Sequence, residues 1–295
     1  MEAGFIRPIS LFLLALLFTG PQPVRAADMP VDLELALGID VSGSVDEEEA
    51  VLQRNGYIAA FRHPSIVGAI QHGRLGRIAV SYYEWAGFGH MKIIAPWTLI
   101  KDKGSANGFA DLLTREEPET ARRTAIAAAI AFGADYFDGN GFSARRRVLD
   151  ISGDGPNNWG ELVNVARDRA IAKGITINGL PIVNNRPSFS GRMPMANLDL
   201  YYRDCVIGGP GAFYIVAKDF KDFARAVLRK LILEIAGRQP KRPAIQRTQR
   251  RSLLIRITNN PARANKTAPP CDAGEQMRWQ RLEDDDDILF PPLRR

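Results

Sequence analysis

The spacing of apolar residues along the middle of the chain switches repeatedly between the period of a strand and the period of a helix. Apolar residues occupy every second position from Leu33 to Ile39 and stop at Asp40, which predicts a buried strand. From residue 46 to 62 they follow one stripe at helical spacing, which predicts an amphipathic helix. The same periodicities predict further strands at 77–85, 91–99, 147–152, 174–183 and 212–217, and further helices at 124–137, 159–172 and 219–236.

This order of elements predicts an α/β fold. Strands that alternate with helices form βαβ units, so we expect a doubly wound, mostly parallel sheet with helices on both faces, as in Rossmann-like folds. A Gly-rich turn at 86–89 joins two predicted strands, which indicates one antiparallel hairpin at the edge of the sheet. Residues 27–237 suit a single domain of this kind, and ligands of such domains bind beyond the carboxyl ends of the strands.

The net charge changes meaning once it is divided along the chain. The 295 residues have a formal net charge of +6, which by itself indicates binding to nucleic acid or to an anionic surface. Residues 27–237 hold 24 Lys and Arg against 25 Asp and Glu, however, whereas residues 238–295 hold 13 against 7. The predicted domain is therefore nearly neutral, and we expect no nucleic-acid partner for it.

The first 26 residues have the pattern of a signal peptide. Arg7 lies in a short polar lead, an apolar run extends from Leu11 to Phe18, and Gly and Pro residues precede the expected cleavage before Ala27. A membrane anchor is the alternative, but the apolar run is much shorter than the roughly 20 residues that span a bilayer. We therefore expect an exported protein, either periplasmic or secreted.

Residues 238–295 form a basic, Pro- and Arg-rich segment in which the apolar periodicity fades. Such a segment buries too little apolar surface to offset its chain entropy, so we expect a disordered, solvated tail. Contact between this tail and an anionic envelope surface is the alternative.

The chain has two cysteines, Cys205 in the predicted domain and Cys271 in the tail. Export permits a disulfide between them, but two isolated cysteines do not establish a disulfide framework. We expect a buried Cys205 and an unpaired Cys271, with the disulfide as the alternative.

Oxygen-bearing side chains gather at the predicted carboxyl ends of two strands. Asp40, Ser42 and Ser44 come at the end of the first strand, Asp154 follows the strand at 147–152, and Thr124 opens a helix. Two carboxylates and three hydroxyls without a neighbouring His or Cys suit a hard cation. The sequence therefore predicts a Mg²⁺ site, with Mn²⁺ or Ca²⁺ as alternatives.

In this arrangement the chain resembles the von Willebrand factor type A (vWA) domain over about residues 31–237. The metal-ion-dependent adhesion site of that family has an Asp-x-Ser-x-Ser motif, then a Thr from a second loop and an Asp from a third. The resemblance implies that the hydroxyls of Ser42, Ser44 and Thr124 bind the metal. It also implies that Asp40 and Asp154 act directly or through water, and that an acidic group of a partner completes the coordination.

Two departures from the family pattern lie beside the motif. The third loop is Ser152-Gly153-Asp154-Gly155 where family members often have Thr-Asp-Gly, and Arg122-Arg123 precede Thr124 where a Gly is frequent. The two arginines either weaken a cation site or recruit an anionic partner. Thr120 is the alternative ligand if Thr124 is misaligned.

Three of the five site residues also have a purely structural interpretation. Ser44 followed by Glu47 fits a capping box, and Thr124 fits an ordinary helix N-cap. Asp154 before Gly155 fits turn chemistry. The set of five at strand and helix ends favours the metal site over these separate explanations.

Candidate contact residues surround this edge of the sheet. Asn157 and Trp159 follow the third loop, and Arg186 and Arg192 lie in a long polar loop after a strand. The alternative is that Trp159 packs against the sheet and that the polar loop has no binding role.

Three classes of function fit these features. We favour an exported, non-catalytic protein that binds a protein or another acidic ligand through a bridging Mg²⁺. A phosphatase-like hydrolase with Asp40 as nucleophile is the first alternative, although such enzymes usually have a second acid where this chain has Ser42. A vWA subunit of an ATP-driven remodelling or metal-insertion complex is the second alternative, against which the predicted signal peptide argues.

Overall fold

A five-stranded sheet forms the centre of the molecule. The computed structural model describes residues 27–87, 89–183, 193–219, 222–238 and 267–278. The sheet has the order β4-β3-β2-β6-β7, in which only the β3–β4 pair is antiparallel. Its strands are β2 (Glu34–Asp40), β3 (Ile78–Trp85), β4 (Met91–Ile100), β6 (Arg147–Gly153) and β7 (Ile175–Pro181), and a separate short pair joins β1 (Met29–Pro30) to β5 (Phe142–Ser143). The predicted parallel sheet with one antiparallel edge hairpin is confirmed.

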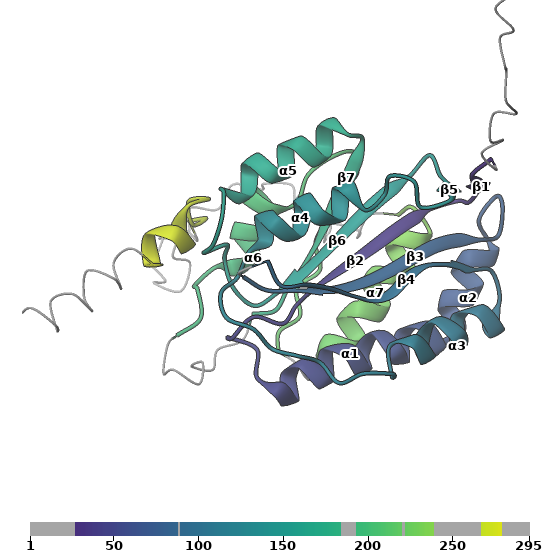
Figure 1. The fold of residues 1–295 in the computed structure, drawn as a ribbon, viewed down its shortest axis with the longest axis horizontal. Coiled ribbons are helices and arrows are strands. Elements are labelled where there is room, and N and C mark those ends of the chain that lie inside the picture. The colour runs from purple at the N-terminus through teal and green to yellow at the C-terminus, as the bar shows by residue number, and fades with distance from the viewer. Residues whose placement is uncertain (1–26, 88, 184–192, 220–221, 239–266, 279–295) are drawn as a thin grey trace, which may run out of the picture.

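Helices cover both faces of the sheet (Figure 1). One layer consists of α1 (Glu47–Arg62), α2 (Pro64–Gln71), α3 (Lys103–Leu112) and α7 (Phe223–Ile235). The other consists of α4 (Ile126–Asp135), α5 (Val163–Ala172), α6 (Leu198–Tyr201) and the π-helical turn η1 (Tyr202–Val206). The prediction of a doubly wound α/β fold is therefore confirmed.

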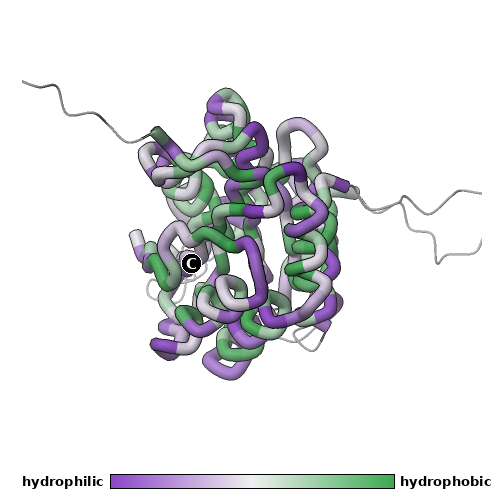
Figure 2. The backbone as a smooth tube through the Cα atoms, turned by 90° about the vertical axis from the view of Figure 1, so that its right-hand side faces the viewer, coloured by the Kyte–Doolittle hydropathy of each residue, from purple (hydrophilic) through white to green (hydrophobic). Residues whose placement is uncertain are grey.

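The sheet separates two hydrophobic cores. Along β2, Leu35 and Leu37 pack with α1 and α7, whereas Ala36 packs with α4 on the opposite face. Every residue of β2 and β3 is buried, as expected for parallel strands that are covered on both faces. In Figure 2 the helices carry both hydrophobic and hydrophilic positions, as expected for helices that pack on one side only.

The register of the central strands places the loops after β2 and β6 side by side. Ile39 of β2 pairs with Ser152 of β6, and Asp40 pairs with Trp85 of β3. The loop that leads into α4 joins this edge, because Ser42 forms an isolated parallel bridge with Ala121. Three loops that are distant in sequence therefore meet at the carboxyl ends of β2 and β6.

Two predicted elements differ from the structure. The segment 212–217 forms only two isolated bridges beside β7, Gly179 with Tyr214 and Ile182 with Ala217, because Pro181 between them has no backbone N–H to donate. The helix predicted at 159–172 begins only at Val163, since Gly160 adopts a left-handed conformation (φ 88°) just before it.

The tail is tied to the domain by a disulfide. Cys205 of η1 is bonded to Cys271, so the expectation of an unpaired Cys271 is wrong. The segment 267–278 ends in a helical stretch over 273–278, in a part of the tail for which the sequence predicts disorder. The predicted signal peptide at 1–26 and the remaining tail, 239–266 and 279–295, lie outside the described residues. Within the described part of the chain, no helix is long and apolar enough to cross a membrane.

Candidate metal site

The five residues predicted as metal ligands lie in one cluster at the carboxyl ends of β2 and β6. The Ser44 hydroxyl donates to Oδ1 of Asp154 (2.6 Å). The Ser42 and Ser44 hydroxyl oxygens are 3.3 Å apart, and the Thr124 hydroxyl donates to that of Ser42 (3.1 Å). The backbone N–H of Ser42 donates to Oδ1 of Asp40 (2.7 Å).

The two carboxyl groups of the cluster are withdrawn from water. Asp40 has 0% of its surface exposed and Asp154 has 7%. Burial raises the pKa of Asp40 well above its ordinary value, and the charge of Asp154 raises it further. Burial also raises the pKa of Asp154 to about 6, against the opposing effect of its hydrogen bond from Ser44. Two buried carboxylates so close together need a compensating positive charge when both are ionised.

The hydroxyl groups of the cluster do not serve as helix caps. The N-cap of α1 is Asp46, which forms a capping box with Glu49, so the capping box proposed for Ser44 is wrong. The N-cap of α4 is Ala125, which has no side-chain cap, so Thr124 does not cap that helix either. Thr120, the alternative to Thr124, is exposed and is not part of the cluster.

The chemistry of these donors fits a hard cation. Oδ2 of Asp40 is buried and has no hydrogen-bond partner among the described residues, which leaves a carboxylate oxygen available for a ligand. Among the described residues, no three His, Cys, Asp or Glu side chains form a metal-binding group by themselves. A cation at the cluster therefore depends on hydroxyl and water oxygens as well as the two carboxylates, which is the coordination that Mg²⁺ favours.

Several residues around the cluster have no motif in the sequence. A Cβ added at Gly153 would lie 2.7 Å from Oδ2 of Asp40 and 2.8 Å from the hydroxyl of Tyr202, so only glycine fits there. Gln53 of α1 donates to the backbone carbonyl of Asp40 (3.2 Å). Tyr202 belongs to η1, which is distant in sequence from the motif. In the sequence, the only sign of this close packing is that the third loop, Ser152-Gly153-Asp154-Gly155, differs from the family pattern.

The four predicted contact residues differ in where they lie. Asn157 is completely buried, and its Oδ1 accepts from the backbone N–H of Ala127 (2.9 Å), so it fixes the start of α4 and does not lie on the contact surface. Trp159 is half-buried, with the guanidinium groups of Arg123 and Arg278 over its ring. Arg186 and Arg192 lie outside the described residues.

Asn158, which lies between the predicted contact residues Asn157 and Trp159, contacts the cluster directly. Its Oδ1 accepts from the backbone N–H of Thr124 (2.9 Å), and its Nδ2 donates to the Thr124 hydroxyl (3.3 Å). The backbone N–H of Asn158 also donates to the carbonyl of Thr124 (2.8 Å). Asn158 therefore joins the loop that carries Thr124 to the loop that carries Asp154 through these hydrogen bonds.

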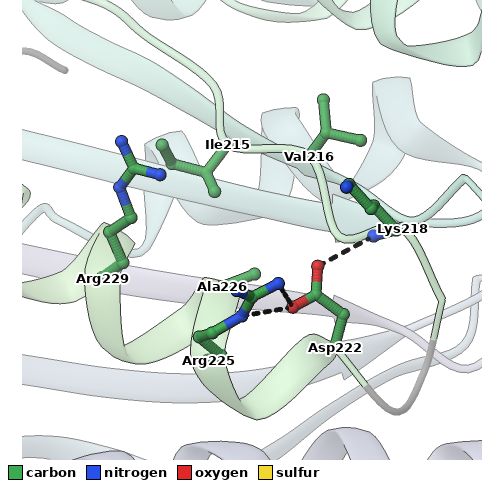
Figure 3. Close-up of a pocket in the computed structure, with 7 residues that line it drawn as sticks. All are labelled: Ile215, Val216, Lys218, Asp222, Arg225, Ala226 and Arg229. Carbon is green, nitrogen blue, oxygen red and sulfur yellow. Dashed lines mark hydrogen bonds and ion pairs between the residues drawn. The ribbon is translucent and has the colours of Figure 1, made fainter. Parts of the chain in front are cut away.

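A pocket of about 360 Å³ lies beside the first turns of α7 and contains no residue of the cluster (Figure 3). Asp222 occupies its floor, where it is paired with Arg225 and accepts from the backbone N–H of Lys218 (3.3 Å). The cationic side chains around it are largely exposed. The pocket is lined by Ile215, Val216, Lys218, Asp222, Arg225, Ala226 and Arg229.

Solved structures with a similar fold include proteins of attachment structures. The chain is similar to proximal thread matrix protein 1 of the mussel byssus, with 14% identity, a TM-score of 0.52, and coverage of 72% of this chain and 50% of that chain. It is similar to the pilus adhesin SpaC of Lactobacillus rhamnosus GG, with 13% identity, a TM-score of 0.50, and coverage of 71% of this chain and 31% of that chain. A von Willebrand factor type A structure from Catenulispora acidiphila matches with 14% identity, a TM-score of 0.47, and coverage of 70% of this chain and 43% of that chain.

The chain thus spans half or less of each of these structures. At these low identities, the matches to proximal thread matrix protein 1 and SpaC show a shared fold alone. No curated protein sequence matches this chain significantly. A family described as "Protein of unknown function (DUF1194)" matches residues 30–239, which include the whole sheet and all five residues of the cluster. The chain therefore belongs to this family of unknown function, and its fold is that of the vWA domain.

Proposed function

We propose that this protein is an exported, non-catalytic binding protein that holds Mg²⁺ at the cluster of Asp40, Ser42, Ser44, Thr124 and Asp154. The metal, when bound, offers an open coordination position to an acidic group of a partner. The observation that carries the proposal is the buried Oδ2 of Asp40, which has no hydrogen-bond donor among the described residues and lies close to a second buried carboxylate. A cation at this position supplies the missing counter-charge.

Several observations favour binding over catalysis. A phosphatase-like mechanism uses an accessible nucleophile, whereas the Asp40 side chain is completely buried. One of the proteins with a similar fold, the pilus adhesin SpaC, is also named for adhesion. Recognition of an acidic group by the metal needs no group that moves a proton.

Export is supported by the disulfide between Cys205 and Cys271. Disulfides persist in oxidising compartments and are rare in a reducing cytosol. This feature argues against a role as a subunit of a cytoplasmic ATP-driven complex. It agrees with the signal peptide expected in the first 26 residues.

Metal-dependent thermal stability tests this function. Millimolar Mg²⁺ or Mn²⁺ should raise the melting temperature of the purified full-length protein, because a ligand that binds only the folded state stabilises it. Asp40→Ala should abolish this rise. Glu48→Gln, at an exposed acidic residue in the first turn of α1, should leave it unchanged. A wild-type melting temperature that does not change with metal would refute the proposal.

A further inference from the structure

The disulfide-tied segment 267–278 lies against the rim of the candidate metal site, although it is outside the family match at 30–239. The hydroxyl of Tyr201 donates to the carbonyl of Cys271 (3.3 Å), and Nδ2 of Asn157 donates to Oε1 of Glu275 (2.5 Å). A Cβ added at Gly274 would lie 1.9 Å from the carbonyl oxygen of Asn157, so the backbones are in direct contact. The segment, drawn in yellow in Figure 1, is therefore part of this face of the domain.

Two arginines from distant parts of the chain contact the ring of Trp159. The guanidinium carbon of Arg123 lies 5.8 Å from the ring centroid, and that of Arg278 lies 5.2 Å from it. Both distances are within the range of attraction between a cation and an aromatic face. We call this group of three side chains, Trp159, Arg123 and Arg278, the Trp159 clamp.

The Trp159 clamp is adjacent to the metal cluster through the covalent chain. Arg123 directly precedes Thr124, and Trp159 directly follows Asn158. Two hydrogen bonds join Thr124 to Asn158. The backbone N–H of Thr124 donates to Oδ1 of Asn158 (2.9 Å), and the backbone N–H of Asn158 donates to the carbonyl of Thr124 (2.8 Å). The clamp therefore continues the rim of the cluster and is fixed to the residue that offers the third hydroxyl.

The backbone holds Arg123 in an unfavourable conformation to keep it at this position. Its φ is 70°, which non-glycine residues seldom adopt. The backbone N–H of Gly87 donates to the carbonyl of Arg123 (2.7 Å), and a Cβ at Gly87 would lie 2.3 Å from the Cβ of Arg123. Among the described residues, no carboxylate forms an ion pair with Arg123. Its cationic head is thus placed on the rim by the fold.

We propose that the Trp159 clamp is a second contact of the same binding surface and that the partner is a protein segment with two acidic side chains. One carboxylate reaches the metal, and the other is received by the guanidinium groups of Arg123 and Arg278, which bind a carboxylate through paired N–H donors. This inference rests on the proposed function.

Peptide probes with one or two carboxylates test the inference. The probes are Gly-Ser peptides with blocked ends that carry two Asp residues separated by one to four positions, and matched peptides in which one Asp is Asn. With millimolar Mg²⁺, a two-Asp peptide should bind the full-length protein about tenfold more tightly than its Asn counterpart, a factor typical of one added charged hydrogen-bonded contact. Isothermal titration calorimetry measures both affinities.

Variants of the clamp locate this preference. Arg123→Gln and Arg278→Gln should each remove most of the preference for the two-Asp peptide and leave the affinity for the one-Asp peptide unchanged. Arg122→Gln, at the exposed neighbouring residue, should change neither affinity. Replacement of both Cys205 and Cys271 by Ser should lower the preference as Arg278→Gln does, because the tie of the segment is lost.

Several results overturn the inference. Equal affinities for both peptides at every spacing, no binding of either peptide, or an equal loss of both affinities in the Arg variants contradict it. Displacement by inorganic phosphate as effectively as by the two-Asp peptide shows a general anion site instead. If Mg²⁺ raises the melting temperature while the peptides are not distinguished, only this inference fails. If Mg²⁺ has no effect on the melting temperature, the proposed function itself fails.

Discussion

At the scale of single residues, the cluster depends on the lack of a side chain at Gly153 as much as on the oxygen atoms around it. Gly153 leaves the space in which Oδ2 of Asp40 and the hydroxyl of Tyr202 lie, each less than 3 Å from where a Cβ would stand. Neither oxygen has a hydrogen-bond partner among the described residues. The glycine is therefore as much a part of the candidate site as the side chains that offer ligands.

Gly153→Ala tests this requirement. The added methyl group should displace Asp40 or Tyr202, lower the free energy of unfolding by about 1–3 kcal/mol, and weaken Mg²⁺ binding. Thermal melts with and without Mg²⁺ measure both effects. Gly155→Ala is the matched control, since its nearest new contact is the Thr124 hydroxyl at 3.8 Å, an ordinary van der Waals distance. Equal behaviour of the two variants contradicts the steric argument.

At the scale of elements, a second buried polar group joins α7 to the sheet. Lys230 of α7 pairs with Asp150 of β6 and with Glu234 one turn further along (2.5 Å). Nδ2 of Asn178 donates to the same Glu234 carboxylate (2.7 Å). Burial raises the pKa of Asp150 to about 7, since the pairing with Lys230 only partly offsets the loss of water and the charge of Glu234 opposes ionisation.

The raised pKa of Asp150 predicts a particular dependence of stability on pH. A carboxyl group whose folded pKa exceeds its unfolded value binds more protons in the folded state, so its contribution to stability is full below about pH 4 and is lost as the pH rises through 7. The free energy of unfolding of Asp150→Asn, relative to the wild type, should therefore be higher at pH 8 than at pH 5 by more than about 1 kcal/mol. Urea denaturation of both proteins at the two pH values, without added metal, measures this change, and a difference between them that does not grow with pH contradicts the prediction.

The elements themselves were predictable where the apolar pattern is strong. The strand expected at 33–39 is β2 at Glu34–Asp40, and the helix expected at 46–62 is α1 at Glu47–Arg62. Helix α3 was not predicted, because its ten residues include two glycines and few apolar positions. The strand predicted at 212–217 is reduced to two isolated bridges for another reason, because Pro181 of the neighbouring strand β7 has no backbone N–H for the bond between them.

At the scale of the whole molecule, the disulfide decides which part of the tail belongs to the domain. It joins residues that are 66 positions apart, and the hydrogen bonds of Tyr201 and Asn157 hold the segment around Cys271. In contrast, the strands and helices of the two cores come almost entirely from residues 27–237. The sheet should therefore remain folded when the disulfide is broken, while the segment 267–278 loses its fixed position.

Hydrogen exchange with and without reductant checks this division. Reduction should remove the protection of the backbone amides at 273–278, which the structure places in a helix, and leave β2 and β6 protected. The purified protein, denatured without reductant, should show no free thiol. Detection of two free thiols, or unchanged protection of 273–278 after reduction, contradicts the assignment.

The sequence by itself determined the α/β fold and the five candidate ligand residues, because both depend on local patterns: the periodicity of apolar residues and an ordered set of carboxyl and hydroxyl groups at strand and helix ends. Only the tertiary structure decided that Asp40 is fully buried, that Gly153 makes room beside it and that Cys271 returns to Cys205. These features arise from contacts between residues far apart in the chain. Their geometry is set by strand register and packing, which no local pattern encodes.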